Sequence, residues 1–206
     1  METCFPAASP PSLVALDFES TGAVPGHADA PWQLGLVAFD LRSDRPPLLR
    51  DHLLHIPAGR PFNPYAPGRH AQLRPQLDAA PAFHDLWPSL SPLLARGQIL
   101  VAHNASTERR FLARLAPLTP FPAWIDTLVL ARAAFPALPS HALADVAAAA
   151  DLLPALDALL PGRTWHDALY DALAAALFLR WLAAQPAWAG LTLPALVRLS
   201  AAQPSK

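Results

Sequence analysis

The sequence predicts an α/β fold, a single domain in which helices flank a mixed β-sheet. Apolar runs suited to strands come first, and strands then alternate with helical patterns, which is typical of such a sheet. A chain of 206 residues suits one domain, and its 53% of hydrophobic residues can form a sizeable core. We expect the domain to span residues 12–184, between an irregular leader at 1–11 and a C-terminal tail at 185–206.

The first half of the chain predicts two or three strands and a long loop. The apolar run from Ser12 and the run Trp32–Leu41 flank a turn-rich stretch, so we expect them to pair as a hairpin. Residues 47–56 are a candidate third strand, although their alternation is imperfect. Residues 57–75 are rich in proline, glycine, arginine and histidine and predict a surface loop.

The second half predicts helices separated by short strands. Residues 83–94 have helical apolar spacing, and Gly97 is expected to stop this helix. The later elements are expected as a strand at 98–104, a helix at 106–116, a strand passing into a helix at 123–135, a helical stretch at 141–160 broken at Pro154, and a long helix at 167–184.

Charge and cysteine content restrict the partners and the compartment. The formal net charge of −1 excludes a global positive field, so any contact with nucleic acid must be local. The single cysteine, Cys4, cannot form an internal disulfide, which favours a cytoplasmic location. The start of the chain lacks the pattern of a signal peptide, and charges and prolines interrupt the apolar C-terminal stretches, so we expect no membrane association.

Two acids, Asp17 and Glu19, end the first apolar run. Residues two apart on a strand share one face, so the two carboxylates are forced close together. At ~5 Å and an effective dielectric of ~20 their repulsion is about 3 kcal/mol. A shared proton, a basic partner or bound divalent cations could relieve it.

Two later segments add acids and a histidine. Glu108 shares one helix face with Phe111 and Leu112 and is expected to point inward, where a cation would offset its charge; the alternative is an ordinary helix acid paired with Arg110 or solvent. In RTWHDALYD, Asp171 lies near the edge of an apolar helix face, and His166 precedes the helix start. There a neutral imidazole is favoured and can accept a proton, although a cap or surface residue is the plainer interpretation.

These segments resemble the three motifs of the DnaQ-like 3′-to-5′ exonuclease superfamily, in the subgroup with a histidine five residues before the last aspartate. LDFESTG is similar to D-x-E-T-T-G, VAHNASTERRFL to V-x-H-N-x-x-F-D-x-x-F-L, and HDALYDALAAALFL to H-x-A-x-x-D-A. The resemblance covers roughly residues 12–180 and implies a ribonuclease H-like sheet. One departure is Thr107–Glu108 in place of phenylalanine–aspartate, which moves the carboxylate outward by about 1 Å, a shift that can cost ~100-fold in rate.

The resemblance implies two-metal phosphodiester hydrolysis at single-stranded or frayed 3′ ends, with DNA slightly favoured over RNA. Two Mg²⁺ or Mn²⁺ ions would be held by Asp17, Glu19, Glu108 and Asp171, and His166 would deprotonate the attacking water. Asp17 would bridge both ions, Glu19 and Asp171 would hold the ion on the nucleophile side, and Glu108 would help to hold the other. A ligand set of oxygens alone favours such hard cations over zinc.

The resemblance also implies substrate contacts, each with a plainer alternative. Ser20, Thr21, Gly22 and the side chain of Phe18 would meet the terminal nucleotide, although a core position is the plainer interpretation of Phe18. Further contacts are expected from His103 and Asn104, which otherwise end a strand and cap a helix, and from Arg163, which otherwise is a solvated loop residue.

Two other functions remain open. The change at Glu108 could leave a module that only binds nucleic-acid ends, or the site could act as a phosphodiesterase on small nucleotides. The partner is expected to be a nucleic-acid 3′ end, with a DNA polymerase or repair complex as a further possibility through the apolar residues 191–206; the alternative is that this tail packs on its own domain.

Overall fold

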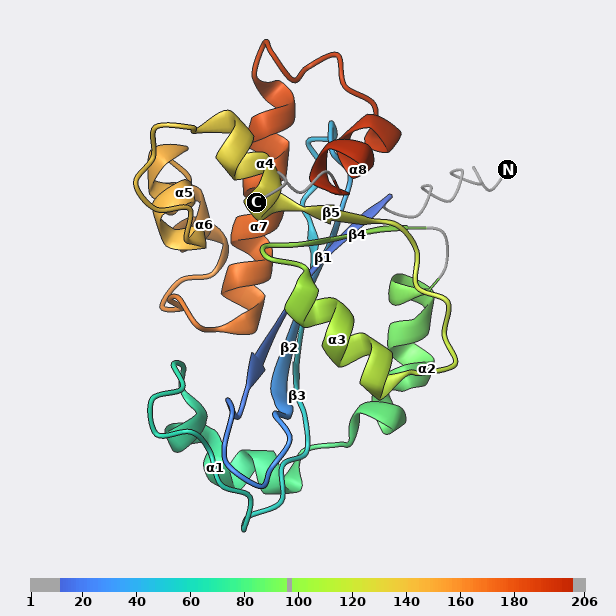
Figure 1. Cartoon of the computed structure of the whole chain (residues 1–206), viewed down its shortest axis with the longest axis vertical. Helices are drawn as coiled ribbons and strands as arrows, with labels where there is room; N and C mark the ends of the chain where they lie inside the picture. Colours follow the sequence, from blue (N-terminus) through green and yellow to red (C-terminus); the bar gives the residue numbers. More distant parts are fainter. Residues whose placement is uncertain (1–11, 96–97, 202–206) are drawn as a thin grey trace, which may run out of the picture.

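A computed structural model of the chain describes residues 12–95 and 98–201 (Figure 1). The predicted leader at 1–11, which contains Cys4, and the predicted helix stop Gly97 lie outside these residues. No helix within the described ranges is long and apolar enough to cross a membrane.

A five-stranded mixed sheet in the order β3-β2-β1-β4-β5 forms the centre of the fold. Its strands are β1 (Leu13–Ser20), β2 (Pro31–Phe39), β3 (Leu48–Leu53), β4 (Ile99–Ala102) and β5 (Trp124–Asp126). β1 pairs antiparallel with β2, which pairs antiparallel with β3; β4 is parallel to both β1 and β5. The predicted hairpin, third strand and mixed sheet are therefore confirmed.

Helices cover both faces of the sheet (Figure 1). They are α1 (His70–Ala79), α2 (Phe83–Leu94), α3 (Ser106–Leu115), α4 (Thr127–Ala134), α5 (Leu143–Ala149), α6 (Leu153–Leu159), α7 (Ala168–Ala184) and α8 (Leu193–Ala201). Leu13 and Ala15 of β1 pack with α4 to α8 on one face, and Val14, Leu16 and Phe18 pack with α2 and α3 on the other. Since both faces of β1 are buried, its sequence is a nearly continuous apolar run.

Two predicted boundaries are wrong. Residues 70–75 of the expected loop belong to α1, because Leu73 and Leu77 pack against Trp32 and Ile56, and this burial outweighs the proline inside the helix. The helical stretch 141–160 breaks at residues 150–152, not at Pro154. Asp151 adopts a left-handed backbone there with φ 54°, and Pro154 lies in the first turn of α6, where a missing N–H costs little.

The start of α7 lies directly against β2. Gly35 is the partner of Asp17 in the β1–β2 register, and a Cβ atom on Gly35 would lie 2.2 Å from the backbone carbon and oxygen of Ala168. Only a glycine permits this approach. Consequently the first turn of α7, with Asp171, lies over the strand segment that carries Asp17.

The C-terminal helix α8 packs on β5 and α4. Leu196 is buried, and the Ser200 hydroxyl donates a hydrogen bond to the backbone oxygen of Trp124 at 3.3 Å. This agrees with the expectation that the tail packs on its own domain. The proposed limits of that domain, residues 12 and 184, stay predictions.

Candidate active site

The C-terminal end of β1 carries Asp17 and Glu19 on the face that α7 covers. Their neighbours Leu16 and Phe18 point into the core on the opposite face. Asp17 is half-buried, and only 7% of Glu19 is exposed. The predicted sharing of one strand face is therefore confirmed, and both carboxylates lie out of bulk solvent.

The first turn of α7 brings a third carboxylate to this face. Asp167 caps the helix, since its Oδ1 accepts the backbone N–H groups of Leu169 and Tyr170 at 3.2 and 3.3 Å. Asp171 follows one turn later and accepts the backbone N–H of His166 at 3.3 Å. His166 is exposed and has a left-handed backbone, with φ 64°. This turn fixes the histidine beside the carboxylate.

Glu108 supplies the fourth carboxylate from the first turn of α3. It is 3% exposed and forms no ion pair with Arg110 within the described part of the chain, so the alternative of an ordinary surface acid is wrong. The start of α3 is held by Asp126 at the end of β5, whose carboxylate accepts the N–H groups of Asn104 and Ala105, each at 3.0 Å.

All four carboxyl groups have raised pKa values, and burial is the main cause. It raises the pKa of Glu19 and of Glu108 to about 8 and that of Asp171 to about 7. Burial also raises the pKa of Asp17, followed by repulsion from Asp171, then Glu108, then Glu19. These four acids from three distant segments therefore share one electrostatic environment.

The site fits a divalent cation. The Oε2 atom of Glu108 and the Oδ1 atom of Asp171 are buried without a hydrogen-bond partner, and none of the four acids pairs with a lysine or arginine among the residues described. One ligand atom each from Glu19, His166 and Asp171 lie within 4.8 Å of one another. A basic partner is thus absent here, and clustered oxygen donors suit hard ions.

Comparison with known protein families identifies the class of this protein. The RNase T exonuclease family matches residues 14–179. The chain belongs to this family. The predicted resemblance to DnaQ-like exonucleases and the ribonuclease H-like fold are confirmed, and the chain is a nuclease by this membership. None of the curated proteins compared with it matches significantly.

Solved structures of several other proteins have the same fold as this chain. Exonuclease X in complex with 5′ overhanging duplex DNA is 25% identical with a TM-score of 0.61, and the match covers 91% of this chain and 99% of that one. The Mg²⁺- and Mn²⁺-bound form of S. pombe Pop2p is 14% identical with a TM-score of 0.62, over 89% and 87% of the two chains. E. coli Exonuclease I in complex with a 5cy-dT13 oligonucleotide is 14% identical with a TM-score of 0.65, over 92% of this chain and 42% of the other.

A fifth acid beside this cluster, Asp167, has a different environment from Asp17, Glu19, Glu108 and Asp171. Although burial raises its pKa, a hydrogen bond and the charge of Arg163, and then the charge of Arg69, lower it overall. Arg163 Nη1 lies 2.8 Å from Asp167 and 2.6 Å from Asp51 of the exposed strand β3. Asp167 is a structural residue that the sequence analysis did not single out, although an aspartate before an apolar helix is a recognisable cap.

The predicted substrate residues fall into two groups. Ser20, Thr21 and Gly22 directly follow Glu19, and Gly22 has a left-handed backbone with φ 71°. Phe18 is buried edge-to-face on Phe111, with ring centroids 5.5 Å apart, which is the core position given as its alternative.

The remaining three lie at other edges of the site. His103 is bonded through Nδ1 to the Thr127 hydroxyl at 3.0 Å and through Nε2 to the His141 carbonyl oxygen at 2.8 Å, whereas Asn104 is exposed. Arg163 is engaged by two carboxylates. Roles for these residues in substrate binding stay predictions.

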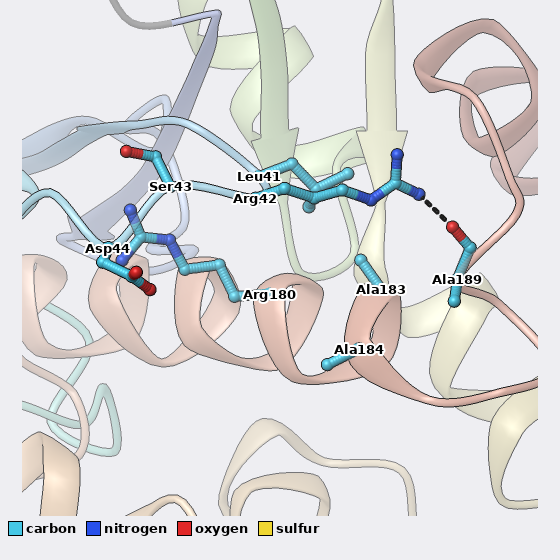
Figure 2. A pocket seen from close by; sticks show the side chains of 8 residues that line it. All are labelled: Leu41, Arg42, Ser43, Asp44, Arg180, Ala183, Ala184 and Ala189. Carbon is cyan, nitrogen blue, oxygen red and sulfur yellow. Dashed lines mark hydrogen bonds between the residues drawn. The ribbon is translucent and has the colours of Figure 1, made fainter.

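A cavity of about 640 Å³ at the far end of α7 is separate from the acids (Figure 2). It is lined by Arg42 and Arg180 among others, beyond the end of β2, whereas Glu19 pairs with Gln33 at the start of β2. Arg42 donates to the backbone oxygens of Ala189 and Leu191 at 2.6 and 2.9 Å. Since Arg180 also donates to backbone oxygens, this cavity offers no ready site for an anion.

Proposed function

We propose that the protein is a metal-dependent 3′-to-5′ exonuclease acting on single-stranded or frayed 3′ ends, with DNA slightly favoured over RNA. The observation that carries this proposal is that four carboxylates, two buried and two half-buried, come together without basic partners beside an exposed histidine. Support comes from the family and from the DNA bound to Exonuclease X and Exonuclease I.

The proposed cofactors are two Mg²⁺ or Mn²⁺ ions, held by Asp17, Glu19, Glu108 and Asp171. Such ions, when bound, supply an activated water and stabilise the negative charge that develops on the scissile phosphate. The oxygen donors and the Mg²⁺- and Mn²⁺-bound form of Pop2p support this choice, although a zinc-bound form of the E. coli Exonuclease I complex also exists.

His166 is proposed to accept the proton of the attacking water. Its ligand atom lies within 4.8 Å of those of Glu19 and Asp171, and its exposed ring is open to solvent and substrate. The left-handed backbone at His166 is a costly conformation for a non-glycine residue, and it is held by the N–H bond to Asp171. This conformation costs stability, and it fixes the backbone that carries the proposed base, His166.

The backbone of Ser20–Gly22 is proposed to hold the terminal nucleotide next to Glu19. A Cβ atom on Gly22 would lie 2.8 Å from the Cβ of Asn63, so a side chain there would displace the neighbouring loop. The interaction with a polymerase or repair complex is not proposed, because the C-terminal helix α8 is packed on β5 and α4. A cytoplasmic location stays a prediction.

Digestion of matched DNA and RNA oligonucleotides, labelled at the 5′ or the 3′ end, tests this proposal in Mg²⁺ and in Mn²⁺. We expect single nucleotides released from the 3′ end, lost in Asp17→Asn and retained in the exposed control Asp145→Asn. Binding of ends without release would favour the binding module, and turnover of dinucleotides alone would favour the small-nucleotide phosphodiesterase.

The variant Glu108→Asp tests the departure from the family motif. We expect it to lose activity, because Glu108 is buried and its surroundings accommodate the longer side chain. A faster variant would instead show that the extra methylene is a handicap.

A further inference from the structure

The stretch from Pro57 to Arg69, between β3 and α1, lies against the proposed active site; we call it the 57–69 segment. The backbone N–H of Asn63 donates to the carbonyl oxygen of Thr21 at 2.8 Å, and its side-chain amide donates to that of Ala23 at 3.2 Å. A Cβ atom on Gly68 would lie 3.0 Å from the His166 carbonyl oxygen and 3.5 Å from Glu19 Oε2. Figure 1 shows the segment beside the end of β1 and the start of α7.

The base of the 57–69 segment is packed against α1 and bonded to the start of α7. The Phe62 ring stacks on His70 with centroids 4.8 Å apart, and the Arg74 guanidinium lies 4.3 Å from the Phe62 centroid. Arg69 at the end of the segment pairs with Asp167, the cap of α7. The segment therefore keeps its position before any substrate binds, which lowers the entropy cost of binding.

The side chain of Tyr65, in the middle of this segment, does not pack against the rest of the fold. It is 92% exposed, whereas the other large hydrophobic side chains exposed in the described ranges are all leucines. Its backbone N–H is held by the Asn63 side chain at 2.9 Å, two residues from the contact with Thr21. A solvated aromatic ring on a backbone that is held beside a site for nucleotides is suited to stacking on a base.

The charge of this region also suits a nucleic-acid strand. Residues 53–77 contain three arginines and no aspartate or glutamate. Arg60 and Arg74 form no ion pair in the part of the chain that the structure covers and donate to backbone oxygens instead. Their charge is therefore not neutralised by carboxylates, and it can attract the phosphates of a strand that enters the site.

We propose that the 57–69 segment binds the strand on the 5′ side of the terminal nucleotide, with Tyr65 stacking on one of its bases. This rests on the proposed function, in which Ser20–Gly22 hold the terminal nucleotide. The segment contacts Thr21 and Ala23 directly, so the next nucleotides of the strand pass over it. Stacking of this kind is tolerant of sequence, because every base has a flat face.

Steady-state kinetics of Tyr65→Ala, Tyr65→Phe and a matched control, Leu118→Ala, test the proposal. Leu118 is a 97% exposed side chain beyond α3. The substrates are a single-stranded DNA 12-mer, the same 12-mer with abasic residues at the second and third positions from its 3′ end, and thymidine 5′-p-nitrophenyl phosphate, which has no upstream nucleotides.

We expect Tyr65→Ala to raise KM for the intact 12-mer roughly 5- to 100-fold with little change in kcat. Tyr65→Phe and Leu118→Ala should match the wild type, and all three variants should hydrolyse the small ester normally. The penalty of Tyr65→Ala should largely disappear on the abasic strand, because the base that stacks is missing.

An unchanged KM for Tyr65→Ala would overturn the proposal. A loss of kcat on the small ester would overturn it too, because it would assign Tyr65 to the shape of the catalytic site. If the wild type releases no nucleotides, the proposed function fails separately. Fluorescence anisotropy of the labelled 12-mer in Ca²⁺ then decides the stacking role: weaker binding by Tyr65→Ala supports it, and equal binding refutes it.

Discussion

Replacing Glu108 with glutamine is expected to make the metal-free protein more stable while it disables the site. Burial raises the pKa of Glu108 to about 8, whereas a glutamate in the unfolded chain titrates near 4.5. For a carboxyl with a raised pKa in the folded state, the folded protein binds more protons, so stability falls as the pH rises from 4.5 towards 8. At pH 7 the penalty is about 3 kcal/mol, since each pKa unit is worth ~1.4 kcal/mol.

The assay is thermal unfolding in EDTA between pH 5 and pH 8.5. Near pH 5, where the acid is protonated in the fold, Glu108→Gln and the wild type should differ in stability by less than ~1 kcal/mol. The variant should gain about 6–12 °C by pH 7, given ~2–4 °C per kcal/mol for a chain of this size. Asp145→Asn, on the exposed face of α5, is the control. A difference that does not change with pH, or a variant that is less stable throughout, would refute the reasoning.

Two further predictions concern the support of the site. Gly35→Ala would place a Cβ atom 2.2 Å from the backbone of Ala168. It should therefore destabilise the fold by about 1–3 kcal/mol in thermal melting and abolish nuclease activity in oligonucleotide digestion. Wild-type activity would contradict the close approach of α7. Arg163→Ala should destabilise the fold by about 1–2 kcal/mol, because the Arg163 guanidinium forms ion pairs with Asp51 and Asp167. It should leave KM for the oligonucleotide nearly unchanged. A raised KM at unchanged stability would instead assign Arg163 to a substrate phosphate.

The acids of the site could be found from the sequence because their spacing is local. Asp17 and Glu19 are two residues apart on a strand, and Glu108 lies on the same helix face as Phe111 and Leu112, so each orientation follows from strand or helix period. That these segments meet followed only from the resemblance to a family. The pairing of distant segments is not a property of any local pattern.

Other parts of the site depend on contacts across the fold. Gly35 looks like an ordinary glycine in a strand, and its role appears only when α7 lies on it. Residues 70–75 of α1 were predicted as loop because the burial of Leu73 and Leu77 cannot be recognised in a stretch rich in proline. Likewise, the attachment of the 57–69 segment to Thr21 joins backbone groups that carry no signal in the sequence.

The central claim is that four acids share a site for divalent ions. Calorimetric titration of Mn²⁺ and Mg²⁺ at pH 7, repeated in two buffers of different ionisation enthalpy, tests it most directly. Because the pKa values of Glu19 and Glu108 are about 8 and that of Asp171 about 7, uptake of the ions should release protons into the buffer, and Asp171→Asn should weaken it. Absence of uptake, even with an oligonucleotide present, or uptake without proton release would contradict the claim.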